Sequence, residues 1–265
     1  MTKVQIGVVL SAVLLVVLIY FGLSTKSSEI RTLEKSRVLT LEQTNADALI
    51  LDAKETMSEA QLSKVLLLEN RLRNVAIDSA KVNIYEQLAS EWYQLGFASI
   101  SGYFAQQIAE LINTEDSWAI TGTTYAIGIQ RATSEKERDF STGRAITAFE
   151  NAISLNPDNI QHRVNLALCY TENPPADNPM KGVQLLLELN NSQPESVPVL
   201  NALARLAIKT GQYERAVTRL ETAVSIEPFN VASVCMLATA YKESGNSIKA
   251  LEFEKKCGEL SQEVN

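Results

Sequence analysis

The sequence has few of the residues on which metal and disulfide sites depend. It contains one histidine, His162, and three cysteines, Cys169, Cys235 and Cys257. The cysteines form no CxxC pair, so the spacing predicts neither a zinc site nor a disulfide framework, and we expect all three to be small apolar packing residues in a reducing compartment. His162 has no Asp, Cys or second His at ligand spacing. We expect a partly buried structural histidine and no bound metal.

Motifs of catalytic and nucleotide-binding folds are also missing. The sequence has no P-loop, no Rossmann glycine pattern, no HExxH and no GxSxG. The acidic pairs Glu135 with Glu137 and Glu252 with Glu254 fall on expected helix surfaces, where solvated charge is the usual state. We therefore expect no enzyme activity, no cofactor and no small-molecule substrate.

Glycine and proline are scarce, and the balance of charge is negative. There are 11 glycines and 7 prolines, and the net charge is −7. A negative chain is poorly suited to a phosphate backbone, which excludes nucleic acid as the expected partner. Recurring Leu, Ala, Glu and Lys, with strand signals missing, predict an all-α fold.

One long apolar run stands near the N-terminus. Residues 4–23 read VQIGVVLSAVLLVVLIYFGL and carry no charge. At about 1.5 Å per residue, such a helix spans a hydrocarbon core of about 30 Å. The run is longer than a signal-peptide core, and no small-x-small cleavage site follows it. We expect an uncleaved, single-pass transmembrane helix in a lipid bilayer.

The orientation of this helix is predicted from its flanking basic residues. Lys3 precedes the run, whereas Lys26, Arg31, Lys35 and Arg37 follow it. This count favours a cytoplasmic location for the C-terminal part. A short N-terminal tail with one lysine is also typical of anchors that begin inside the cell, so a periplasmic location stays open.

A helical stalk is expected over residues 24–81. Its clearest helix begins at Ser58, because Ser58 and Gln61 have the spacing of a capping box. Leu62, Val65 and Leu72 then recur at helical steps. We expect this helix to pack on the first unit of the repeats that follow.

A repeat with a period of about 34 residues covers the rest of the chain. The approximate units are 82–115, 115–159, 160–196, 197–230 and 231–264, within a repeat domain of residues 82–265. In the plainest unit, 197–230, Gly211 is expected to take a positive φ in a tight turn, and Pro228 to end the second helix. Residues 160–196 hold extra residues in the loop ENPPADNP, and 115–159 hold extra residues at 131–141, which should lengthen the first helix or project as a loop.

These units resemble the tetratricopeptide repeat family. Trp118, Gly122 and Tyr125 have the spacing W-x3-G-x2-Y, and the units 115–159 and 197–230 carry A-x3-[FL]-x2-A followed by proline. The resemblance implies a right-handed α-solenoid whose first helices line a concave groove for extended peptides or partner helices. The layout of anchor, stalk and repeats also resembles a group of membrane-anchored proteins in bacteria of the Bacteroidetes kind, which implies the bacterial inner membrane.

Mapping the family's groove positions onto this chain gives a candidate protein-binding surface. Its residues are Tyr93, Thr123, Leu168, Asn201, Arg205, Lys209, Thr239 and Lys242. The cations lie toward the C-terminal units, which suits an acidic ligand, although a solvated surface without ligand is an equal alternative. The family's clamp for a C-terminal carboxylate is missing, because Val164, Leu168, Cys235 and Thr239 occupy the matching places.

Three functions remain open at this point. The leading one is a membrane-tethered scaffold or adaptor that binds a partner protein in the groove. The second is a structural subunit of a larger membrane or envelope complex, which would use the convex face and residues 131–141. The third is an enzyme with a site of unknown type, for which no residue can be named.

Overall fold

The computed structural model describes Gln5 and residues 46–263. The chain divides into a unit of residues 1–45 and a compact unit that begins at Ala46. Apart from Gln5, the predicted anchor at 4–23 and residues 24–45 of the predicted stalk lie outside the described residues. Within the described part, none of the helices has the length and apolar character needed to cross a bilayer.

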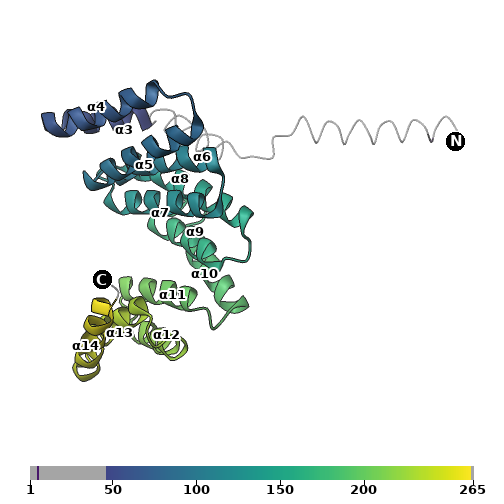
Figure 1. Cartoon of the computed structure of the whole chain (residues 1–265). Helices are drawn as coiled ribbons and strands as arrows, with labels where there is room; N and C mark the ends of the chain where they lie inside the picture. Colours follow the sequence, from purple (N-terminus) through teal and green to yellow (C-terminus); the bar gives the residue numbers. More distant parts are fainter. Residues whose placement is uncertain (1–4, 6–45, 264–265) are drawn as a thin grey trace. The chain divides into compact units, whose positions relative to one another are not determined.

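The described part is helical throughout and contains no strand, as predicted (Figure 1). In chain order its helices are α3 (Ala46–Glu55), α4 (Glu59–Arg73), α5 (Asp78–Gln94), α6 (Ala98–Ile112), α7 (Glu115–Arg131), α8 (Glu135–Leu155), α9 (Ile160–Glu172), α10 (Lys181–Ser192), α11 (Val197–Lys209), α12 (Tyr213–Ile226), α13 (Val231–Glu243) and α14 (Ser247–Glu263).

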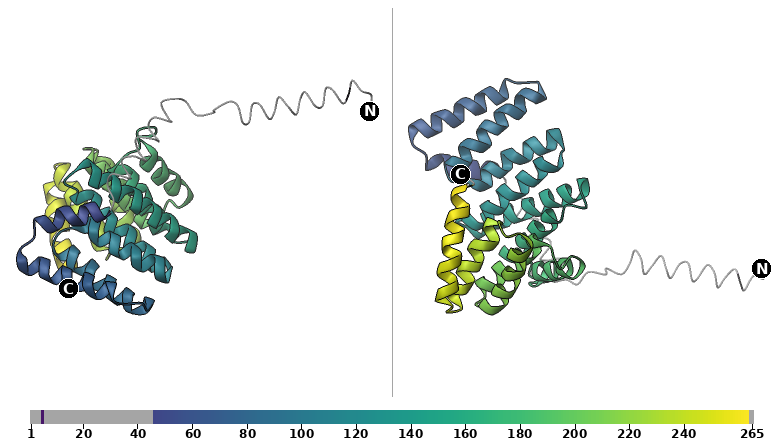
Figure 2. Two further views of the ribbon diagram at one scale, coloured as in Figure 1. Left: turned by 90° about the horizontal axis from the view of Figure 1, so that it is seen from above. Right: turned by 60° about the horizontal axis from the view of Figure 1, so that its bottom comes forward.

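From α5 onward the helices form consecutive antiparallel pairs. Each helix packs on the one that follows it, and alternate helices such as α7 and α9, α9 and α11, and α11 and α13 also touch (Figures 1 and 2). This is the helical-hairpin stack expected from the repeats. The first pair begins at Asp78 and not at residue 82, because Asp78 sits in the favourable first turn of α5, where it pairs with Lys81 at 2.9 Å.

Side-chain caps define where several helices begin. Ser58 and Gln61 form the predicted capping box of α4, and Thr114 and Ser117 form another at α7. Ser134 accepts a hydrogen bond from the backbone of Glu137 at the start of α8. These caps satisfy backbone N–H groups that have no partner within the helix, which explains why the boundaries fall at these residues.

Glycine shapes the tight turns inside the pairs. Gly211 has φ 73° between α11 and α12, as predicted, and Gly245 has φ 84° between α13 and α14. Side chains with a Cβ rarely adopt this conformation, and glycine adopts it without penalty. The short turns that result bring the two helices of each pair together.

A glycine also allows the α7–α8 pair to pack closely. A Cβ added at Gly122 would lie 2.7 Å from the ring of Phe149, which is fully buried. Trp118 and Tyr125, the other residues of the W-x3-G-x2-Y pattern, are 8% and 0% exposed. The pattern therefore marks the buried face of α7.

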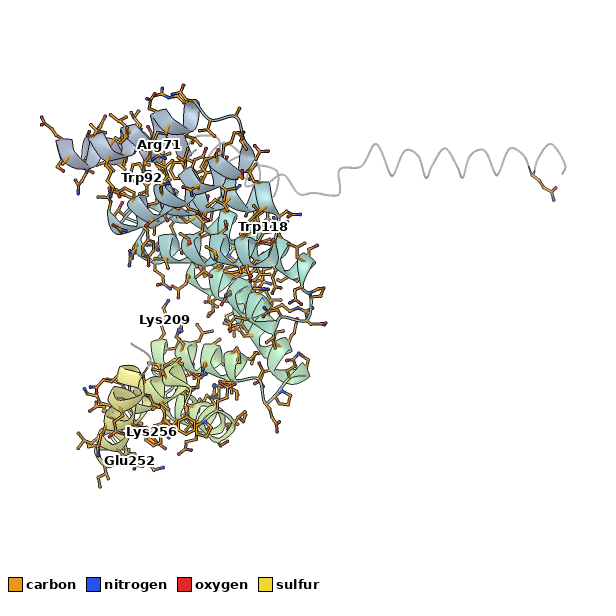
Figure 3. All side chains as sticks on the ribbon, viewed as in Figure 1. Arg71, Trp92, Trp118, Lys209, Glu252 and Lys256 are labelled. Atoms are coloured by element: carbon orange, nitrogen blue, oxygen red, sulfur yellow. A yellow bond between two sulfur atoms is a disulfide. The ribbon has the colours of Figure 1, made fainter. Side chains whose placement is uncertain are left out.

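Helix α4 packs on the first pair, as predicted. Its Val65 and Leu68 are buried together with Ile84, Leu88 and Trp92 of α5 (Trp92 is labelled in Figure 3). Lys64 of α4 also forms an ion pair with Glu91 of α5. The described end of the predicted stalk is therefore packed against the repeats.

Residues 131–141 agree with the prediction only in part. They do not project as a loop, because α7 ends at Arg131 and α8 begins at Glu135. The extra residues of this unit lengthen both of its helices, since α7 has 17 residues and α8 has 21, whereas α11 and α12 of the plainest unit have 13 and 14. The carboxylate of Glu137 accepts hydrogen bonds from the Thr133 backbone at 3.1 Å and from the Ser99 hydroxyl at 2.8 Å. Phe140 is buried against Tyr125, so the segment packs into the stack.

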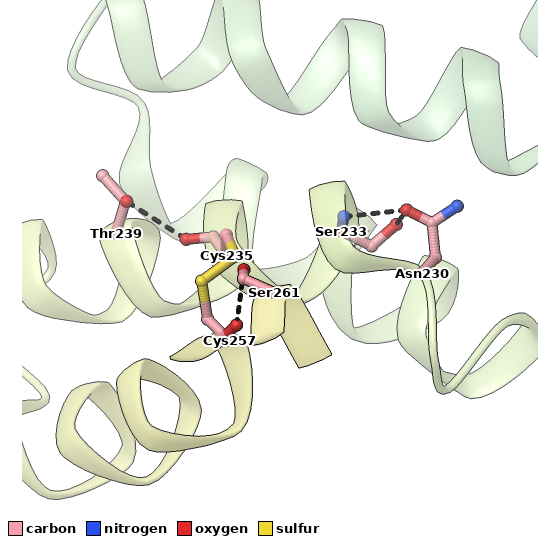
Figure 4. The surroundings of a disulfide bond; sticks show 6 residues. All are labelled: Asn230, Ser233, Cys235, Thr239, Cys257 and Ser261. Carbon is pink, nitrogen blue, oxygen red and sulfur yellow. Dashed lines mark hydrogen bonds between the residues drawn. A yellow bond between two sulfur atoms is a disulfide. The ribbon is translucent and has the colours of Figure 1, made fainter. Parts of the chain in front are cut away.

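The prediction of three unpaired cysteines was wrong. Cys235 of α13 and Cys257 of α14 form a disulfide, with Cα atoms 5.0 Å apart (Figure 4). The two residues are 22 positions apart, and only the antiparallel pairing of α13 with α14 brings them together. Cys169 is free and buried, as predicted for all three.

Candidate functional site

A cavity of about 160 Å³ lies between the first helices of three successive pairs. Its lining comes from α7, α9 and α11, with one aromatic side chain from α8. The lining residues are Thr123, Ala126, Ile127, Ile129, Gln130, Phe149, Asn165, Leu168, Cys169, Glu172 and Arg205. The cavity therefore combines aliphatic, amide, hydroxyl and charged groups on one face of the stack.

Three of the predicted groove residues meet in this cavity. Thr123 lies on α7, Leu168 on α9 and Arg205 on α11. They are far apart in the sequence, and the stacking of first helices brings them together. The mapping from repeat positions thus selected residues that line one hollow surface.

The other five predicted residues do not line the cavity. Tyr93 lies under Arg131, whose guanidinium carbon is 5.4 Å from the ring centre. The Asn201 side-chain oxygen accepts a hydrogen bond from Ser233 at 2.9 Å, and the Thr239 hydroxyl donates to a backbone carbonyl of its own helix. The remaining two, Lys209 and Lys242, are engaged in ion pairs.

The cations of the predicted groove differ in whether they have a partner. The Nζ atom of Lys209, labelled in Figure 3, lies 3.0 Å from a carboxylate oxygen of Glu172, and Lys242 lies 3.7 Å from Glu254. Arg205 is exposed and makes no ion pair or hydrogen bond with any residue that the structure describes. Its positive charge is therefore uncompensated at the edge of the cavity.

The floor of the cavity is uncharged. Phe149, Ile129 and Cys169 are buried at 3% exposure or less. Burial, with a smaller contribution from the nearby Glu172 carboxylate, raises the pKa of the Cys169 thiol to about 12. Because the thiol stays protonated at neutral pH, Cys169 contributes an apolar wall and has no thiolate with which to attack a substrate.

His162 belongs to a structural cluster away from this cavity. Its Nε2 atom lies 2.7 Å from the carboxylate of Glu115, which also accepts hydrogen bonds from Asn156 and Asn159. The hydrogen bond with His162, followed by those from Asn159 and Asn156, lowers the pKa of Glu115 to about 2. This cluster joins the start of α7 to the start of α9. His162 is 5% exposed, so it is more buried than the partly buried histidine that the sequence predicted.

A second hollow lies where α4 and α5 diverge. Its volume is about 580 Å³, and its lining residues are Asn70, Arg71, Asn74, Val75, Ser79, Ala80, Asn83 and Ile84. Several of these polar groups already bond to one another or to neighbours, as Arg71 does with Gln87. None of the predicted groove residues lines it. Elsewhere, the described residues contain no group of three or more His, Cys, Asp or Glu side chains that could hold a metal ion.

Several residues that line the cavity were not among the predicted groove residues, although a pattern in the sequence could have identified them. On α7 the lining residues include Thr123, followed at three, four and seven positions by Ala126, Ile127 and Gln130. On α9 the same spacing gives Asn165, Leu168, Cys169 and Glu172. Such steps mark one face of a helix. Extending each predicted groove position along its helix face would have found Gln130, Asn165 and Glu172.

Comparison with protein families matches residues 197–230 to the tetratricopeptide repeat. Helices α11 and α12 therefore form a tetratricopeptide repeat. These are the boundaries that the sequence predicted for its plainest unit. Comparison with curated proteins gave no match.

Several solved structures are similar to this chain over about two thirds of its length. The crystal structure of MamA protein is 16% identical, covering 68% of this chain and 92% of that one, with a TM-score of 0.39. MamA from Desulfovibrio magneticus is 14% identical, covering 69% and 96%, with a TM-score of 0.40. YrrB, described as a TPR protein with an unusual peptide-binding site, is 14% identical, covering 67% and 84%, with a TM-score of 0.37. At these identities and scores, the likeness carries no conclusion about function.

Proposed function

We propose that this chain is a protein-interaction scaffold that holds an extended segment of a partner protein in the cavity between α7, α9 and α11. One observation carries the proposal. Thr123, Leu168 and Arg205, selected from repeat positions, line a single cavity on the first helices of the stack. First helices of such repeats form the surface on which an extended ligand can contact several units at once.

The lining suits a peptide. Thr123, Gln130 and Asn165 supply hydroxyl and amide groups that can bond to the backbone of an extended chain. Ala126 and Leu168 supply aliphatic contact beside them. A small number of polar groups in a mainly apolar hollow is typical of a binding site, because the apolar area favours association and the polar groups orient the ligand.

The scaffold is proposed to be tethered to a bacterial inner membrane by residues 4–23. The uncharged run in the sequence is the support for this tether. A role as an assembly subunit that uses residues 131–141 as a projecting loop is less well supported, because this segment is packed into α8. An assembly role would have to use another surface.

For the side of the membrane, two observations favour opposite answers. The basic residues after the apolar run favour the cytoplasm, but large domains cross membranes largely regardless of flanking charge. The disulfide between Cys235 and Cys257 favours an oxidising compartment, because thiols in the bacterial cytoplasm are kept reduced. We propose the periplasmic side for this reason.

The side of the membrane is tested by trapping thiols in rapidly acid-quenched cells with an alkylating reagent. On the proposed side, Cys235 and Cys257 remain oxidised and unlabelled until a reductant is added. Immediate alkylation of both residues would place the repeats in a reducing compartment. A chain carrying both Cys235→Ser and Cys257→Ser shows the labelling due to Cys169 alone.

The scaffold proposal is tested by placing a photo-cross-linking amino acid at position 168 of the full chain in cells. We expect a cross-linked product of discrete mass, because Leu168 lines the cavity. The same amino acid at position 163 is the matched control, since Arg163 lies exposed on α9 and does not line the cavity.

A cavity-blocking substitution completes this test. Thr123→Trp fills the hollow from the neighbouring helix and should abolish the product from position 168. A product that survives Thr123→Trp, or that forms equally from position 163, would contradict binding in the cavity.

A further inference from the structure

We infer that the segment held in the α7–α9–α11 cavity carries a carboxylate that pairs with Arg205. This inference rests on the proposed function and adds the chemical class of the ligand. It follows from the distribution of charge around the cavity.

Among the residues that line the cavity, the cation is Arg205. Two other cations on the lining helices are engaged: Lys209 is paired with Glu172, and Arg131 lies over the ring of Tyr93. Arg205 has no such partner in the part of the chain that the structure describes. The fold therefore leaves this guanidinium available.

The charge of the cavity has the opposite sign to that of the protein. The whole chain has a net charge of −7. In the lining, the single carboxylate is that of Glu172, and Lys209 already compensates it. The buried Cys169 thiol is neutral. One uncompensated positive charge remains, on Arg205, and it will favour an anionic group over a neutral or cationic one.

The shape of the guanidinium points to a carboxylate. Its planar fork of N–H donors matches the two oxygens of a carboxylate, and such pairs are stronger than neutral hydrogen bonds. The neighbouring Asn165 and Leu168 offer amide and aliphatic contacts for the rest of the segment. The ligand is therefore an acidic peptide segment, with its carboxylate either on an Asp or Glu side chain or at its C-terminus.

The probe for the test is a random dodecapeptide library displayed on phage and selected against the full chain in lipid nanodiscs. Peptides are first sorted by whether Thr123→Trp prevents their binding, which identifies those in the cavity. Those peptides should be enriched in Asp or Glu at one position. We expect Arg205→Glu to weaken their binding about tenfold or more and to select basic residues at that position in a fresh selection.

Arg163→Glu is the matched control, because it makes the same change of charge on α9 outside the cavity. It should leave both the affinity and the acidic preference unchanged. Because Arg205 is exposed and unpaired, its replacement should also leave the thermal unfolding of the chain unchanged. Synthetic peptides with free and amidated C-termini then show which carboxylate is used, since amidation removes binding only if the terminus is bound.

The outcomes separate the inference from the proposed function. Cavity-binding peptides without an acidic preference, or with a preference that Arg205→Glu does not alter, would overturn the inference and leave the scaffold intact. If Thr123→Trp prevents the binding of none of the selected peptides, the scaffold proposal and the inference are both overturned.

Discussion

The α7–α8 pair and the α13–α14 pair have the same hairpin plan but are stabilised differently. The α7–α8 pair contacts α6 on one side and α9 on the other, and it buries Trp118, Tyr125 and Phe149. The α13–α14 pair packs mainly on α11 and α12. Ile248 and Leu251 of α14 are 83% and 68% exposed. Within the described residues, the α7–α8 pair is therefore stabilised by interfaces on two sides, and the α13–α14 pair mainly by an interface on one side.

The α13–α14 pair has further links besides this interface. The disulfide ties α13 to α14, and Tyr241 donates a hydrogen bond to Glu221 of α12. Lys249 of α14 lies 3.1 Å from the same Glu221 carboxylate. A covalent bond and a polar network thus stabilise the α13–α14 pair, which packs less extensively on neighbouring helices than the α7–α8 pair does. The following predictions test this contrast, beginning with the largest effect.

Removing Phe149 should be the most damaging change. Phe149→Ala deletes a fully buried ring in the α7–α8 pair and should lower the free energy of unfolding by about 3–5 kcal/mol. Chemical denaturation of the full chain in nanodiscs or detergent measures the change. Ile120→Ala on the same pair is the control, because Ile120 is 61% exposed and should change stability by less than about 0.5 kcal/mol.

Breaking the disulfide should weaken the end of the stack by a smaller amount. For a closed loop of this size, reduction should cost about 3 kcal/mol at most. The loss should be local, so amide hydrogen exchange should accelerate in residues 231–263 and stay unchanged in 115–155. The chain with both Cys235→Ser and Cys257→Ser should not respond further to reductant. Equal acceleration in both regions would remove the contrast between the two pairs.

Two glycine-to-alanine substitutions in the α7–α8 pair distinguish the effect of close packing on stability from the effect of helix propensity. Gly122→Ala should destabilise the chain by about 1–3 kcal/mol, because its Cβ would meet the Phe149 ring. Gly143→Ala should stabilise it by about 0.5–1 kcal/mol, because that position is open and alanine favours a helix. Thermal unfolding of the two variants side by side gives the sign of each effect. If both variants lose stability, the close contact between position 122 and the Phe149 ring is not the cause of the loss in Gly122→Ala.

The smallest effect is expected from acid. Because its three hydrogen bonds lower the pKa of Glu115 to about 2, the carboxylate stabilises the fold fully above about pH 4.5. This contribution is lost as the pH falls from about 4.5 toward 2, and Glu115→Gln should remove that part of the pH dependence. Unfolding measured between pH 2 and pH 6 checks the slope. At the α13–α14 pair, the pKa of Glu221 is lowered by hydrogen bonds from Tyr241 and Lys249, so Glu221→Gln should act in the same direction.

Much of the helical plan could be predicted because local rules carry it. Ser58 with Gln61, Gly211, and the spacing of Trp118, Gly122 and Tyr125 each act within one or two turns of helix. The structure confirmed each of these assignments. For residues 131–141 the prediction missed the longer second helix, because the capping of α8 by Ser134 and the bond from Ser99 to Glu137 decide where that helix begins. The second of these contacts joins residues 38 positions apart.

For the candidate site, the repeat positions were predictable, and the hollow itself was not. The sequence placed Thr123, Leu168 and Arg205 on successive first helices, since a repeat period is visible along the chain. It did not show that Lys209 is engaged by Glu172 while Arg205 has no partner among the described residues, because that depends on how α9 and α11 approach each other.

The sequence by itself determined the helices, their pairing order and the repeat period, because hydrophobic steps, caps and turn glycines act over short distances. Tertiary structure alone decided three things: the disulfide between Cys235 and Cys257, the cluster of Glu115 with His162, and the cavity at Arg205. Each depends on side chains from different helices meeting at a few ångströms. Such distances are set by the packing of helices in three dimensions and not by spacing along the chain.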